Sequence, residues 1–203
     1  MALLYPFLQV KKLLMTKQEL RKQYKAERAA IHGKERLLMD DLLLLQFQQF
    51  DYSSIQTVLT YWPIADHAEP NTHLFSGYLR HLIPGLVIAY PVSDQTSIQM
   101  NAVAIHEDTV FHSNSWGITE PKEGAVIPPE QIDMVFVPLL VCDKQGYRVG
   151  FGKGFYDRYL VNCRPDIVKM GFSYFEPIDK ITDTDQFDVP LTYCITPQHT
   201  YEF

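Results

Sequence analysis

Apolar residues are spaced along the chain in two ways, as short continuous runs and at helical intervals. Continuous runs rich in Val, Ile and aromatic residues predict buried strands, and they occupy residues 55–62, 86–90, 132–141, 167–174 and 191–195. An alternating run at 98–105 predicts a strand near a sheet edge. Helical spacing predicts helices over residues 16–31, 34–47, 72–82 and from 155 to about 162.

Strands that alternate with helices in this order predict an α/β fold. We expect a three-layer sandwich with a largely parallel central sheet, an N-terminal helical pair and a single domain over residues 15–203. The stretch 1–14 is apolar and carries its two lysines late, which is the reverse of the charge order in a signal peptide. We expect this stretch to be an upstream-start extension or a disordered tail.

The first predicted helix begins with a capping box, in which Thr16 is the cap and Glu19 its partner three residues on. Lys17 and Arg21 lie four residues apart and therefore share one face of the helix, and Arg28 continues that face two turns later. Such a row of cations is either a solvated basic face or lies opposite something anionic.

The second helix has a broad apolar face that we expect to pack against the rest of the protein. This face is made of Leu37, Leu38, Leu42, Leu43 and Leu45.

Composition and charge narrow the classes of protein. The formal net charge of -6 argues against general nucleic-acid binding. Cys142, Cys163 and Cys194 are few and widely spaced, which favours reduced thiols in a cytoplasmic protein over a disulfide framework or a zinc site. No apolar run is long enough to span a bilayer.

The stretch 146–160 carries the strongest chemical signal. Gly150, Gly152 and Gly154 alternate with other residues, Lys153 stands between the last two, and Arg148 and Arg158 flank the run. Because the stretch joins a buried strand to a helix, its backbone amides are expected to converge on an anion, and glycine allows close approach. The alternative is a mobile basic loop. The spacing matches neither a Walker A loop nor the dinucleotide-binding fingerprint.

Two other stretches are candidates for a binding site. The loop 64–71 follows a predicted strand and contains Glu69, at the edge of the sheet where α/β proteins commonly bind ligands. His67 and Glu69 match the first part of a zinc deaminase signature, but the cysteine pair that completes it is missing, so that interpretation fails. Trp116 lies in a polar loop and either covers the core or lines a pocket.

With these residues in place, the chain resembles the 5-formyltetrahydrofolate cyclo-ligase family, also called methenyltetrahydrofolate synthetase. The family motif Arg-apolar-Gly-x-Gly-[Gly/Lys]-Gly-[Tyr/Phe]-Tyr-Asp matches residues 148–157 position for position. Lys17 and Arg21 match an amino-terminal Lys-x-x-x-Arg, and Asp188 matches an aspartate before the final strand.

The resemblance implies ATP-dependent closure of 5-formyltetrahydrofolate to 5,10-methenyltetrahydrofolate, with release of ADP and phosphate. Lys153 and Arg148 would be catalytic. The implied ATP-binding residues are Lys17, Arg21, Arg148, Val149, Gly150, Phe151, Gly152, Lys153, Gly154, Phe155 and Tyr156. The implied folate-binding residues are Trp62, Glu69, Trp116, Phe151, Gly152, Lys153, Gly154 and Phe155. Asp157 and Asp188 would bind Mg²⁺, whereas the alternatives are a helix cap for Asp157 and a turn for Asp188.

As partners we expect ATP and a reduced folate, with or without a polyglutamyl tail, and no nucleic acid or membrane. We expect a monomeric cytoplasmic enzyme. Two other hypotheses remain: a non-catalytic nucleotide- or folate-binding regulatory protein of the same fold, and a sugar-phosphate isomerase or acyl-CoA transferase of similar sheet architecture.

Overall fold

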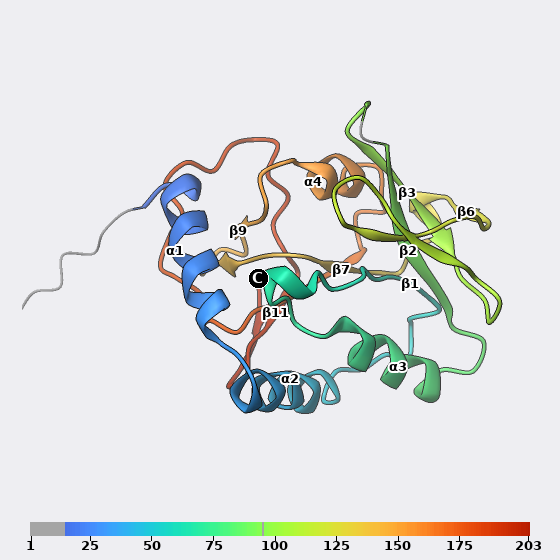
Figure 1. The fold of residues 1–203 in the computed structure, drawn as a ribbon, viewed down its shortest axis with the longest axis horizontal. Coiled ribbons are helices and arrows are strands. Elements are labelled where there is room, and N and C mark those ends of the chain that lie inside the picture. Colours follow the sequence, from blue (N-terminus) through green and yellow to red (C-terminus); the bar gives the residue numbers. More distant parts are fainter. Residues whose placement is uncertain (1–14, 95) are drawn as a thin grey trace, which may run out of the picture.

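The computed structural model describes residues 15–94 and 96–203, so the expected extension at 1–14 lies outside the described residues. In the described part, an eight-stranded sheet crosses the molecule in the order β12-β11-β10-β7-β1-β2-β3-β6 (Figure 1). The strands β11, β10, β7, β1 and β2 pair in parallel, while β12, β3 and β6 are antiparallel. The predicted α/β fold with a largely parallel sheet is confirmed.

The helices are α1 (Lys17–Ala30), α2 (Lys34–Phe47), α3 (Thr72–Leu82) and α4 (Phe155–Leu160). The sheet strands are β1 (Thr57–Leu59), β2 (Val87–Asp94), β3 (Gln99–Ala104), β6 (Val126–Ile127), β7 (Met134–Val137), β10 (Val168–Phe172), β11 (Tyr193–Ile195) and β12 (Thr200–Glu202). Two small hairpins pair β4 (Phe111–Ser113) with β5 (Thr119–Pro121) and β8 (Val141–Cys142) with β9 (Arg148–Val149). Short 3₁₀ turns lie at Ala65–His67 and Pro129–Gln131.

Both faces of the sheet are covered, because side chains of β7 alternate between two cores. Met134 and Phe136 join the core under α2 and α3, whereas Val135 and Val137 join the core under α4. Figure 1 shows α2 and α3 on one side of the sheet and α4 on the other, with α1 beside β9. These layers leave the strand ends next to α1 and α4 accessible for a site.

The predicted strand over 132–141 is wrong in its second half. β7 ends at Val137, directly before Pro138. Proline has no N–H to donate to a neighbouring strand, so the ladder stops there and the chain turns away. Residues 141–142 instead form the β8–β9 hairpin. Its turn is held by Asp143, whose Oδ1 accepts hydrogen bonds from the amides of Gln145 and Tyr147.

The strand β3 lies next to the edge of the sheet, as predicted, with the two-residue strand β6 outside it. Other boundaries differ from the predictions. The strand β12 was not predicted, and α4 ends at Leu160 rather than at about 162. On α2, Leu43 is fully buried, but Leu37, Leu38 and Leu45 remain more than half exposed, so the apolar face is narrower than expected.

The first helix follows its sequence signals closely. Thr16 and Glu19 form the predicted capping box at the start of α1. The unit β1–α3–β2 is a parallel βαβ unit, also as predicted. Cys142, Cys163 and Cys194 are free thiols. No helix among the described residues is both long and apolar enough to cross a bilayer.

Candidate active site at the glycine turn

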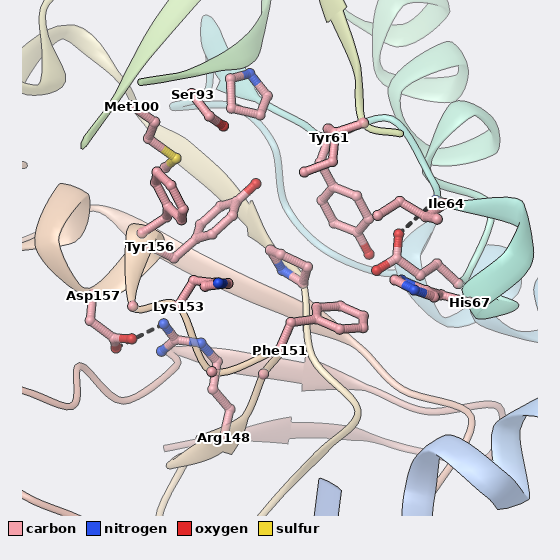
Figure 2. Close-up of a pocket in the computed structure, with 18 of the residues that line it drawn as sticks. Tyr61, Ile64, His67, Ser93, Met100, Arg148, Phe151, Lys153, Tyr156 and Asp157 are labelled. Atoms are coloured by element: carbon pink, nitrogen blue, oxygen red, sulfur yellow. Dashed lines mark hydrogen bonds and ion pairs between the residues drawn. The ribbon is translucent and has the colours of Figure 1, made fainter. Parts of the chain in front are cut away.

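A cavity of about 530 Å³ lies at the carboxyl ends of β1, β2 and β7. It is bounded by the glycine turn (residues 150–154), by one face of α1, and by the loops that follow β1 and precede β11 (Figure 2). Ligands of parallel α/β sheets bind at this edge, because several loops converge where the strands end. The cavity is therefore the candidate active site.

The glycine turn needs glycine at two of its positions. Gly152 and Gly154 have φ values of +91° and +72°, a conformation that side chains with a Cβ rarely adopt. At Gly152 a Cβ would also lie 3.2 Å from the guanidinium carbon of Arg21. Gly150 has ordinary backbone angles, and its carbonyl accepts a hydrogen bond of 2.8 Å from Arg21 Nε. The turn is thus pressed closely against α1.

Three cations of α1 line the cavity at intervals of four residues: Lys17, Arg21 and Lys25. Lys17 Nζ lies 2.6 Å from Asp188 Oδ1, and Lys25 Nζ lies 5.4 Å from the centre of the Phe151 ring. One face of the helix therefore brings positive charge along the whole length of the turn. The predicted face of Lys17 and Arg21 does point into the cavity.

Arg148 is a fixed cation rather than a mobile one. Its side chain is only 7% exposed, and it donates to Asp157 Oδ1 at 2.8 Å and to the Val189 carbonyl at 2.5 Å. The amide of Val189 donates to the same Asp157 oxygen at 3.1 Å. Arg158 does not line the cavity, since it donates to the Lys153 carbonyl at 3.0 Å and so supports the turn from behind.

Lys153 is exposed and lies near the centre of the cavity (Figure 2). Its Nζ is 5.5 Å from the centre of the Trp116 indole. Trp116 in turn contacts Phe155 edge to face, with ring centres 5.7 Å apart. Of the two alternatives for Trp116, the structure supports the pocket wall. Flat apolar faces and a cation thus share one corner of the site.

Glu69 is nearly buried, at 6% exposed, and its Oε2 accepts a hydrogen bond of 2.7 Å from the Ile64 amide. Burial raises the pKa of Glu69 to about 7, while the Ile64 amide and the Arg28 charge oppose the rise. The preceding residue, Ala68, has a φ of +48°, which is strained for alanine. Strain of this kind next to a buried carboxyl is typical of a functional loop.

The two candidate metal ligands, Asp157 and Asp188, both line the cavity. Asp157 does not cap α4, because its Oδ1 binds Arg148 and Val189, so that alternative is wrong. Asp188 does bond a turn, with its Oδ2 accepting from the Asp185 amide at 2.7 Å, and it also pairs with Lys17. Among residues 15–94 and 96–203, no group of three His, Cys, Asp or Glu side chains forms a metal site.

Of the residues that the sequence nominates for ATP, folate or metal, all but Val149 line this cavity. Val149 is fully buried in the core beneath α1, so its side chain cannot face a ligand. The cavity is also lined by residues that the sequence did not indicate, among them Lys25, Tyr61, Ser93 and Met100. Lys25 could have been found, since it follows Arg21 by one helical turn, whereas Ser93 and Met100 come from strands β2 and β3 without any local motif.

The fold and the cavity together define a class: an α/β protein whose pocket gathers cations around a glycine-rich turn at the carboxyl edge of the sheet. The sequence comparison then gives the family. Residues 14–197 match the model of the 5-formyltetrahydrofolate cyclo-ligase family, and the chain belongs to that family.

Individual relatives agree with this assignment. The chain is 39% identical over 87 residues to the 5-formyltetrahydrofolate cyclo-ligase of Haemophilus influenzae, covering 41% of this chain and 46% of that protein. The match thus spans about half the length of that relative. The mouse 5-formyltetrahydrofolate cyclo-ligase is 29% identical over 156 residues, covering 72% of this chain and 74% of that protein.

The fold is also that of a solved relative. The NMR structure of Aquifex aeolicus 5,10-methenyltetrahydrofolate synthetase superimposes with a TM-score of 0.76 at 26% identity. The superposition covers 93% of each chain.

Proposed function

We propose that this protein catalyses the ATP-dependent cyclisation of 5-formyltetrahydrofolate to 5,10-methenyltetrahydrofolate, with release of ADP and phosphate. The observation that carries the proposal is that one cavity is lined by Lys153 together with two groups of residues. One group is the rest of the glycine turn with the cations of α1, and the other is Glu69 with the aromatic residues. Such a cavity suits the meeting of a triphosphate and a pterin.

The triphosphate binds along the glycine turn. Phosphoryl transfer needs alignment and charge neutralisation more than covalent help. The turn amides and Lys153 contact the phosphates from one side, and Lys17 and Arg21 contact them from α1. Arg148 is already held by Asp157, so it acts as a fixed charge beneath the turn.

Asp157 and Asp188 fit Mg²⁺, which needs only one or two carboxylates besides phosphate oxygens and water. Both carboxylates face the cavity, and each is paired with a cation at 2.6–2.8 Å. When bound, Mg²⁺ supplies charge neutralisation at the phosphates. Asp157 and Asp188 would hold the ion, and Lys17, which lies 2.6 Å from Asp188 Oδ1, would add its positive charge beside it.

The folate binds on the other side of Lys153. Glu69 can accept hydrogen bonds from the N–H donors of a pterin ring, and this ring can lie against the apolar faces of Trp62, Trp116 and Phe155. A buried carboxylate with one oxygen already bound to Ile64 has little freedom to turn away. This arrangement would orient the formyl group toward Lys153.

In the reaction, the formyl oxygen attacks the γ-phosphorus and the bond to ADP breaks. Nitrogen 10 of the folate then attacks the formyl carbon and loses its proton, and phosphate leaves with the former formyl oxygen. Lys153, between the reactants, stabilises negative charge on the transferring phosphoryl group. We place this reaction in a monomeric cytoplasmic enzyme that accepts its reduced folate with or without a polyglutamyl tail.

The test is a mixture of the protein, 5-formyltetrahydrofolate and MgATP, monitored for the near-ultraviolet absorbance of the methenyl product. ATP-dependent product supports the proposal. Binding of both ligands without product would favour the alternative of a non-catalytic nucleotide- or folate-binding regulatory protein.

A further inference from the structure

Arg28 is a buried cation that the proposed chemistry does not use. It is 2% exposed, on the face of α1 that lies against the glycine turn and the Glu69 loop. Among the described residues, its guanidinium donates one hydrogen bond, from NH1 to the Leu139 carbonyl at 2.9 Å, and its carbon lies 5.6 Å from the centre of the Phe151 ring. An arginine that is buried away from solvent normally requires more partners than this.

Within the described residues, the Arg28 guanidinium lacks the carboxylate partner that normally offsets the burial of a charge. Within the described residues, Arg28 Nε has no hydrogen-bond partner, and no carboxylate lies within 4 Å of the guanidinium. Burial lowers the pKa of Arg28, but an arginine remains protonated at any physiological pH. Arg28 therefore places a fixed positive charge in the core, and the loss of its hydration makes the folded state less stable.

Glu69 is the carboxylic acid whose charge acts on Arg28, and the charge of Arg28 acts on Glu69 in turn. Phe151 connects the two residues in space: it lies under Arg28 and stacks on His67, with ring centres 4.9 Å apart, and Glu69 follows His67 by two residues. The hydrogen bond from Ile64 uses Oε2 alone, so Glu69 Oε1 is left for a ligand in the cavity.

Other titratable groups around Glu69 cannot replace Arg28. Burial raises the pKa of Tyr61 and of Tyr156, so both phenols stay neutral. Burial and the charges of Lys25 and Arg28 lower the pKa of His67, so it too is neutral near pH 7. Lys25 lies on α1 with its Nζ 5.4 Å from the centre of the Phe151 ring, and it is exposed, so water screens its charge.

We propose that Arg28 is a positioning residue for substrate binding: its buried charge favours the ionised form of the Glu69 carboxyl, which accepts hydrogen bonds in the cavity. A neutral Glu69 would present an O–H donor to the N–H groups of a pterin and would bind it poorly. This role rests on the proposed function, because it takes the pterin as the ligand of Glu69. The interaction between Arg28 and Glu69 does not depend on the proposed function.

The experiment therefore starts with the ligand-free protein. Carboxyl ¹³C NMR of glutamate-labelled protein, with the Glu69 signal assigned by its loss in Glu69→Gln, gives the titration midpoint of Glu69. Arg28→Gln removes the charge but keeps a donor for the Leu139 carbonyl, and Arg28→Lys keeps the charge. Lys22→Met removes an exposed charge from the same helix and is the matched control.

We expect the Glu69 midpoint to rise by at least about one pH unit in Arg28→Gln. Arg28→Lys and Lys22→Met should leave it near the value of the unsubstituted protein. An unchanged midpoint in folded Arg28→Gln overturns the proposal. If Arg28→Gln does not fold, Arg28→Lys decides: a retained midpoint supports the role of the charge, and a raised midpoint overturns it.

Kinetics then separate this inference from the proposed function. In Arg28→Gln the KM for the reduced folate should rise several-fold near pH 6.5 and recover toward pH 8.5, as Glu69 ionises, while the KM for MgATP stays constant. A pH-independent loss overturns the positioning role, because a purely structural defect would behave in that way. A shifted NMR midpoint in a protein that forms no methenyl product supports the Arg28–Glu69 interaction and overturns only the proposed reaction.

Discussion

Arg148 and Asp157 are joined across the glycine turn by a hydrogen bond of 2.8 Å from NH2 to Oδ1. The two residues flank the turn, one in β9 and the other in the first turn of α4. Because the same Oδ1 also accepts from the Val189 amide, the turn, the helix and the loop before β11 are joined at a single oxygen. The ends of the turn are therefore fixed before any ligand arrives.

Removing this contact should harm both stability and turnover. In Arg148→Ala, the partly buried Asp157 loses its cation, and we expect the free energy of unfolding to fall by about 2 kcal/mol. Turnover should fall by at least about a hundredfold, because a charge beneath the phosphates is lost. Thermal or denaturant unfolding and steady-state kinetics measure the two effects.

The matched control is Lys144→Ala. Lys144 also pairs with an aspartate, at 2.7 Å, but its side chain is 64% exposed. An exposed pair contributes at most about 1 kcal/mol. Equal destabilisation by the two substitutions would contradict the structural role given to Arg148.

Lys153 should behave differently, because its side chain is exposed and lies 5.5 Å from the centre of the Trp116 indole without a paired carboxylate among the described residues. We expect Lys153→Ala to lower kcat by about a hundredfold or more while the free energy of unfolding changes by less than about 0.5 kcal/mol. Tryptophan fluorescence should also change, since a cation leaves the indole face. A large loss of stability with normal turnover would reassign the glycine turn to a structural role.

The metal proposal is tested by the Mg²⁺ dependence of turnover. Asp157→Asn and Asp188→Asn should each raise the Mg²⁺ concentration needed for half-maximal rate by at least about tenfold, since even outer-sphere partners have effects of that size. Asp166→Asn is the control, because its carboxylate is 77% exposed and does not line the cavity. An unchanged Mg²⁺ response in both test variants would exclude these aspartates as ligands.

Much of the fold follows from local signals. The capping box at Thr16, the helical spacing of 34–47 and the β1–α3–β2 unit were all predictable, because period and caps are encoded within a few residues. The end of β7 was not predicted because the apolar pattern continues past Pro138, and only the missing N–H ends the ladder. Strands β6 and β12 are too short to carry a pattern and depend on pairing with β3 and β11.

The residues of the candidate site were also predictable only in part. The glycine turn and the face of Lys17 and Arg21 were predictable, because motif and helical period place them directly. Met100 was not, since it reaches the cavity only through the pairing of β3 with β2. Nor could the sequence show that Arg148 is buried against Asp157, because that contact depends on the turn conformation.

Glu69 gives a prediction about stability and pH. Burial raises the pKa of Glu69 to about 7, whereas an unfolded glutamate titrates near 4.5. As pH rises, Glu69 therefore loses its proton in the unfolded chain before it does so in the folded protein. This difference lowers the free energy of unfolding as pH rises from 4.5 to about 7, and by pH 8 the loss amounts to roughly 3 kcal/mol. Below pH 4.5 this effect is absent.

Glu69→Gln should remove that penalty, because glutamine keeps an oxygen for the Ile64 amide but carries no charge. We expect the variant to be more stable than the unsubstituted protein at pH 8, to be about equal to it at pH 4.5, and to bind the reduced folate poorly. Denaturant unfolding across this pH range measures the difference. A stability difference that does not change with pH would contradict the raised pKa.

Simultaneous measurement of methenyl product and ADP shows whether the protein couples ATP cleavage to ring closure. The protein is mixed with 5-formyltetrahydrofolate and MgATP, and methenyl absorbance and ADP release are followed together, alongside Lys153→Ala and a reaction without ATP. We expect equimolar methenyl product and ADP from the unsubstituted protein, with little of either in the two controls. ADP release without methenyl product, or product that does not depend on ATP, would contradict this expectation.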